Sequence, residues 1–167
     1  MRSLAAAVAF VITALAYAEA ESAPADHGAK VYQRCAACHL PNGQGVPGAF
    51  PALAGRLDAA AVSAAGRDYL VVSVANGVMG EIDIDGKKIR GFMPAQAGLS
   101  DADIAAVLNY AMTLSPAGSP ARKVATTPFD AEEVAAIRAR HKGASPNAVH
   151  AMRAAAFAPA PGGVAPQ

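Results

Sequence analysis

The feature that most constrains this chain is a five-residue motif that contains both of its cysteines, Cys35-Ala36-Ala37-Cys38-His39. The residues before it have a helical pattern, and on a helix two side chains three positions apart point to the same side. The motif therefore presents two thiols next to each other, with an imidazole directly after the second. Any fold that keeps this helix places the three groups close together.

A thiol pair followed at once by histidine is the attachment pattern of a c-type haem. Each sulfur can bond one vinyl group while His39 reaches the iron. Three alternatives remain: a thioredoxin-type redox pair, half of a zinc site, and coincidence. The first requires a β–α–β context, whereas residues 30–34 have a helical pattern. The second requires another close pair of ligands, and the remaining histidines are scattered: His27, His141 and His150.

The composition is that of one modest domain that relies on a cofactor for part of its core. The chain has 167 residues, of which 53% are hydrophobic but only 5% are aromatic, and it has no tryptophan. Large apolar side chains are scarce because alanine inflates the hydrophobic fraction, and a flat apolar cofactor would supply the missing surface. The formal net charge of +1 gives no indication of nucleic-acid binding, which requires a concentrated basic face.

Residues 1–20 have the features of a secretory signal peptide. Arg2 precedes an apolar run over residues 4–16, and small residues at 16–18 and 18–20 fit a cleavage site. The run is shorter than the roughly 20 residues of a membrane-spanning helix, although an uncleaved anchor is the alternative. Bacterial haem attachment of this kind takes place outside the cytoplasm. We therefore expect a periplasmic protein with no stable membrane span after cleavage.

Residues 40–55 are dense in proline and glycine, which predicts a long loop without regular structure. A loop of this length in a compact domain is usually functional, and the edge of a haem is a natural object for it to surround. His39 also needs an acceptor for its second ring nitrogen. The backbone carbonyl of Pro51 is the predicted acceptor.

A second candidate iron ligand lies in Gly91-Phe92-Met93-Pro94. The thioether of Met93 is a soft ligand that suits haem iron opposite a histidine. Pro94 disfavours a helical backbone at Met93 and predicts that a loop presents the side chain. Met79 lies in a similar glycine-flanked segment and is the competing candidate, whereas Met112 lies within a predicted helix and is expected to fill the core.

The remaining patterns predict mostly helices. Their expected positions are residues 26–38, 59–65, 68–75, 100–114 and 130–140, with a last helix from Ser145.

Residues 81–90 alternate between apolar and charged around Asp85-Gly86, which is a hairpin turn signal. We interpret the charges of this segment as a solvated loop face. Lys87, Lys88 and Arg90 could attract an acidic partner. Asp83 and Asp85 lie beside these cations and favour a net-neutral surface instead.

Beyond residue 114 the chain exceeds what a minimal haem domain requires. We predict a haem domain over residues 26–114, a linker and helical extension over 115–157, and a disordered tail over 158–167. The two predicted helices of the extension are too weakly apolar to form a core alone. They either fold back on the haem domain or dock a partner.

Four segments together resemble the class I cytochromes c over roughly residues 26–114: the cysteine motif, the loop at 42–51, Gly91-Phe92-Met93-Pro94, and a closing helix with Leu108-Asn109-Tyr110. The resemblance implies an all-α fold around one covalently bound haem c. It also assigns a role to each candidate residue. Cys35 and Cys38 are the thioether anchors, His39 is the proximal ligand, Met93 is the distal ligand, and Pro51 holds the histidine ring.

The resemblance also implies single-electron transfer rather than enzymatic catalysis. It is closest to bacterial periplasmic cytochromes and to cytochrome domains that serve dehydrogenases and oxidases. We therefore expect a redox protein partner, a periplasmic dehydrogenase or a terminal oxidase, with this chain as electron-accepting subunit or partner of a dehydrogenase. The alternative function is a haem enzyme or a small-ligand-binding haem protein in which Met93 is displaced.

Overall fold

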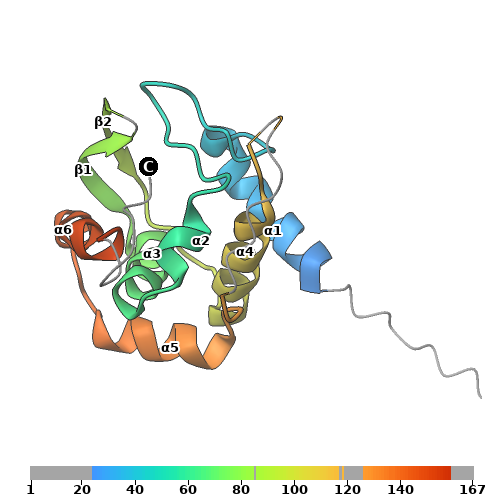
Figure 1. The fold of residues 1–167 in the computed structure, drawn as a ribbon. Coiled ribbons are helices and arrows are strands. Elements are labelled where there is room, and N and C mark those ends of the chain that lie inside the picture. Colours follow the sequence, from blue (N-terminus) through green and yellow to red (C-terminus); the bar gives the residue numbers. More distant parts are fainter. Residues whose placement is uncertain (1–23, 85, 117, 119–125, 159–167) are drawn as a thin grey trace, which may run out of the picture.

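The computed structural model describes residues 24–84, 86–116, 118 and 126–158. The predicted signal peptide, part of the predicted linker and nearly all of the predicted tail lie outside them. Within this part of the chain no helix is long and apolar enough to cross a membrane. The elements, shown in Figure 1, are α1 (Pro24–His39), α2 (Leu57–Ala61), α3 (Ala64–Asn76), β1 (Val78–Ile84), β2 (Lys87–Met93), α4 (Asp101–Thr113), α5 (Ala131–Arg140) and α6 (Pro146–Ala156).

The first helix and the closing helix, α1 and α4, cross in close contact. A Cβ at Gly28 would lie 2.4 Å from the carbonyl oxygen of Ala106, so only glycine permits this approach. Tyr32 packs against Tyr110 with 5.3 Å between ring centroids. The Tyr32 hydroxyl donates to the carbonyl of Leu40 (3.1 Å), and burial raises the pKa of Tyr32 to about 12. This crossing fixes the end of α1 that contains the cysteines.

Side-chain caps set where the helices begin. Ser100 and Asp103 form a capping box at α4, and Asp130 and Ser145 cap α5 and α6. Ser63 caps α3 by accepting from the backbone N–H of Gly66 (3.0 Å). Helix α3 therefore starts earlier than predicted and takes residues that we had assigned to the preceding helix, which ends at Ala61.

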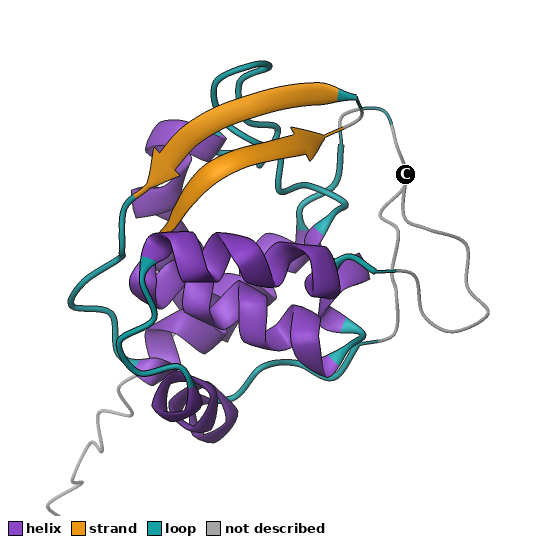
Figure 2. Ribbon diagram, turned by 90° about the vertical axis from the view of Figure 1, so that its left-hand side faces the viewer, coloured by secondary structure: helices purple, strands orange, loops and turns teal. Residues whose placement is uncertain are grey.

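The prediction of an all-α fold is wrong for one segment. Strands β1 and β2 pair as an antiparallel hairpin, from Val78 opposite Met93 to Ile84 opposite Lys87 (Figure 2). The alternating residues around the predicted turn belong to this hairpin, so their charges lie on strands rather than on a loop face. Extended backbone left in a loop would have needed other partners for its N–H and C=O groups, and strand pairing satisfies them. The fold is mostly helical with one small sheet.

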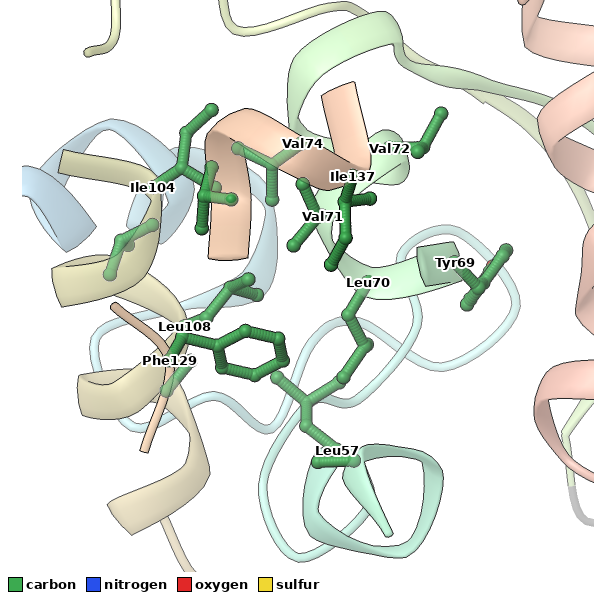
Figure 3. Close-up of a cluster of buried hydrophobic side chains, with 14 of the residues drawn as sticks. Leu57, Tyr69, Leu70, Val71, Val72, Val74, Ile104, Leu108, Phe129 and Ile137 are labelled. Atoms are coloured by element: carbon green, nitrogen blue, oxygen red, sulfur yellow. The ribbon is translucent and has the colours of Figure 1, made fainter. Parts of the chain in front are cut away.

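The two helices beyond residue 114, α5 and α6, fold back on the elements that precede them. Phe129 and Ile137 are 3% and 1% exposed, and Figure 3 shows them in one cluster with Leu70 of α3 and Leu108 of α4. The Asn109 side chain exchanges two hydrogen bonds with the backbone of Phe129, at 2.8 and 2.9 Å. The extension therefore completes the core of the domain.

Because Ile137 belongs to this shared core, truncating its side chain should destabilise the whole haem domain. We expect Ile137→Ala to lower the free energy of unfolding by about 2–5 kcal/mol in a urea titration of the haem-loaded protein. Glu132→Ala, at an exposed position of the same helix, is the matched control. Equal stability of the two variants would contradict a shared core.

Candidate haem site

The described residues enclose a predominantly apolar cavity of about 870 Å³. This volume lies within the range of roughly 300–1,000 Å³ that is typical of small-molecule and cofactor sites. Its wall includes all five residues that the sequence indicated: Cys35, Cys38, His39, Pro51 and Met93. They come from three separate segments, namely the end of α1, the following loop and the end of β2.

Helix α1 brings both thiols to the cavity from its last turn. The helix ends at His39, and Leu40 takes a left-handed backbone conformation (φ 63°) that closes it. Cys35 and Cys38 are half-buried and are not bonded to each other. Burial raises the pKa of the Cys35 thiol. Reactive redox cysteines lie instead at helix N-termini that lower the thiol pKa, so this placement argues against a thioredoxin-type pair.

The imidazole of His39 is held in one orientation from the loop. It is 6% exposed, and its Nδ1–H donates to the carbonyl oxygen of Pro51 at 2.9 Å. This hydrogen bond leaves Nε2 as the ring nitrogen with a free lone pair. Burial lowers the pKa of His39, although the bond to Pro51 opposes the shift. The neutral imidazole that results is the form that binds a metal.

Gly45 allows the loop to close around the Pro51 carbonyl. Its backbone is left-handed (φ 63°), and its N–H donates to the carbonyl of His39 at 2.9 Å. A Cβ at this position would lie 2.6 Å from the Pro51 carbonyl oxygen. Any other residue would push away the acceptor that orients the histidine.

The hairpin forms another wall and separates the two candidate methionines. Most of the hairpin residues on the cavity wall alternate along the strands, and Asp83 and Phe92 also contribute; the alternating set is Val78, Gly80, Ile82, Ile84, Ile89, Gly91 and Met93. Met93 pairs with Val78 at the end of β2 and is half-buried. Met79 is one position out of phase, is 43% exposed and does not line the cavity. The geometry therefore favours Met93, which extends from a strand end rather than from the predicted loop.

The charges of the hairpin largely neutralise one another. Glu81 pairs with Lys88 (2.9 Å) and with Arg90 (3.1 Å). Hydrogen bonds from Lys88 and Arg90 hold the pKa of Glu81 below its ordinary value. This pairing favours the net-neutral surface over a basic patch for an acidic partner.

The cavity is also lined by residues that the sequence did not indicate, among them Ser73 from α3, and Arg153 and Phe157 from the C-terminal end of the chain. The hydroxyl of Ser73 is buried and has no hydrogen-bond partner among the described residues. A Cβ at Gly91 would meet no atom within 4 Å. An unsatisfied buried hydroxyl and open space on one wall are expected where a cofactor fits. Only the tertiary contacts reveal these residues.

The fold and the site define a class I monohaem cytochrome c. A family model for cytochrome c matches residues 25–115, and the chain belongs to this family. Two proteins named cytochrome c-552, both from Thermus thermophilus, are each 46% identical to it over 114 residues. The alignments cover 68% of this chain and 85% and 75% of the relatives. Members carry one covalently bound haem c and transfer electrons rather than catalyse reactions.

If each cysteine bonds one vinyl group, replacing one cysteine should remove one thioether bond and leave the other. We expect Cys35→Ala and Cys38→Ala each to retain haem through a single bond, which denaturing mass spectrometry would report as the chain plus haem. The absorption of the reduced pyridine complex should shift as one vinyl group is restored. The double variant should carry no covalent haem, and a double variant that kept it would contradict the assignment.

Proposed function

We propose that this chain is an exported electron carrier that accepts single electrons from a periplasmic dehydrogenase, as its cytochrome subunit or partner. One observation carries the electron-transfer part of the proposal. His39 and Met93, from separate elements, line the same cavity as the two cysteines. If both bind the iron, its two axial positions are filled and no position is left for a substrate.

In this proposal each residue of the site has a distinct role. Cys35 and Cys38 hold the porphyrin through thioether bonds. His39 supplies Nε2 as proximal ligand, and the Pro51 carbonyl keeps its ring from rotating. Met93 supplies a thioether sulfur as distal ligand. The bound haem supplies an iron that changes by one electron.

The remaining cavity residues favour fast and reversible transfer. The predominantly apolar wall limits water, and a methionine ligand favours ferrous iron, so together they raise the reduction potential. The hydrogen bond to Pro51 keeps the imidazole in place in either oxidation state. Little therefore has to move when the electron arrives, and a small transient interface with the donor is sufficient.

Removing the Met93 sulfur separates this proposal from a ligand-binding or catalytic haem protein. We expect the oxidised wild-type protein to show the iron–sulfur charge-transfer band and the reduced protein to be inert to carbon monoxide. Met93→Ala should lose the band and bind carbon monoxide, because an axial position opens. Met79→Ala is the matched control and should behave as wild type. Carbon monoxide binding by the wild-type protein would support the alternative function instead.

The export and the donor are tested in the native host with the full-length chain carrying a C-terminal tag. We expect the haem protein in the periplasmic fraction, with an N-terminus that follows residue 18 or 20. Its haem should be reduced when the substrate of a co-purifying dehydrogenase is added. Two results would contradict the proposal: recovery in the cytoplasm, or reduction by chemical reductants alone.

A further inference from the structure

Helix α6 lies outside the segment that the family model matches, yet it contributes to the haem cavity. The match ends at residue 115, and α6 begins at Pro146. Arg153 and Phe157, at its C-terminal end, line the cavity together with the haem-domain residues. Figure 1 shows α6 beside β1 and α3. The extension therefore has a surface that faces the cavity as well as one that faces the core.

Contacts at the hairpin hold α6 in this position. His150 Nε2–H donates to the carbonyl oxygen of Glu81 at 2.7 Å. The same ring lies so close to Gly80 that a Cβ there would be 2.4 Å from it. Arg153 is one helical turn further along α6, on the side of His150. Val149 and Ala156 are fully buried and anchor the other side of the helix.

Arg153 has an apolar platform but no anionic partner among the described residues. Its guanidinium lies 4.3 Å from the centroid of the Phe157 ring, which in turn packs edge-on against Tyr69 at 5.9 Å. Four other arginines pair with a carboxylate: Arg67, Arg90, Arg138 and Arg140. Arg153 is half-buried on the cavity wall, where an uncompensated cation is costly.

A haem brings two propionate carboxylates into an otherwise apolar cavity, and each of them also needs a partner. A guanidinium can bind a carboxylate through two parallel hydrogen bonds, and stacking on an aromatic ring preorganises it for this. We propose that Arg153 binds a haem propionate and that α6 is thereby a wall of the haem pocket. The inference rests on haem c in this cavity, and depends neither on the redox donor nor on Met93 as ligand.

A cation at a propionate acts on the iron through its charge. It offsets a negative charge near the haem and so favours the ferrous over the ferric state. At a separation of about 12 Å and an effective dielectric constant of about 20, one charge alters the ferrous-to-ferric ratio by about tenfold. Arg153 is a positioning residue in this account, because it acts through the propionate.

The test uses the haem-loaded full chain with three variants. Arg153→Gln removes the charge and retains a helix-forming side chain, and we expect its reduction potential to fall by up to about 59 mV, the equivalent of a tenfold change for one electron. Arg153→Lys should keep the potential near that of wild type. Arg138→Gln removes the same charge from α5, away from the cavity wall, and should leave the potential unchanged.

Resonance Raman spectra of the propionate bending modes give a second measurement. Substituting a residue that only supports the fold would not change the frequencies of these modes. These modes should shift in Arg153→Gln, and also in Arg153→Lys because one ammonium cannot make two parallel bonds. If Arg153→Gln fails to incorporate haem, the Raman spectrum of Arg153→Lys tests whether Arg153 binds a propionate. Unchanged bending modes in the lysine variant would overturn the proposal, as would a glutamine variant whose potential equals that of Arg138→Gln. The iron–sulfur band should persist in every variant, which separates this test from that of Met93.

Discussion

The hydrogen bond from His39 to the Pro51 carbonyl joins the end of α1 to the loop around the cavity. It fixes the plane of a buried imidazole and leaves Nε2 as the nitrogen for a metal. Gly45 lies against the same carbonyl, and no larger residue would fit there. Because the two cysteines lie in the last turn of the same helix, the orientation of one ring is linked to the position of both thiols.

The hairpin and the C-terminal extension together form the wall from which Met93 extends. The register of β1 and β2 places Met93 opposite Val78 on the cavity side. Helix α6 supports this hairpin through His150, and Phe129 and Ile137 of the extension enter the core beside α3 and α4. The segment beyond the family match is therefore continuous with the haem domain in its packing. A protein with few large apolar side chains gains both core and pocket surface in this way.

Much of the local structure was predictable because it depends on neighbouring residues. The caps at Ser100, Asp130 and Ser145 were readable, since each depends on an oxygen three residues before the N–H that it accepts. The boundary between α2 and α3 was misplaced because the cap at Ser63 went unrecognised. The alternation and the turn at Asp85-Gly86 indicate a hairpin in the sequence, but the prediction of an all-α fold left out the strand pairing. Strand pairing joins residues up to 15 positions apart, such as Val78 and Met93, and a pattern alone does not show it.

The sequence by itself determined the haem-attachment motif, because two thiols and an imidazole within five residues need only one helical turn to converge. It also determined most of the helices through caps and apolar spacing. Only the tertiary structure shows that Met93 and not Met79 lines the cavity, since strand register sets which of them faces it. It alone brought Arg153 to the cavity wall, through contacts between α6 and a hairpin about 70 residues earlier. Such contacts depend on how separate helices and strands pack against one another. The sequence of a single helix or strand does not indicate that packing.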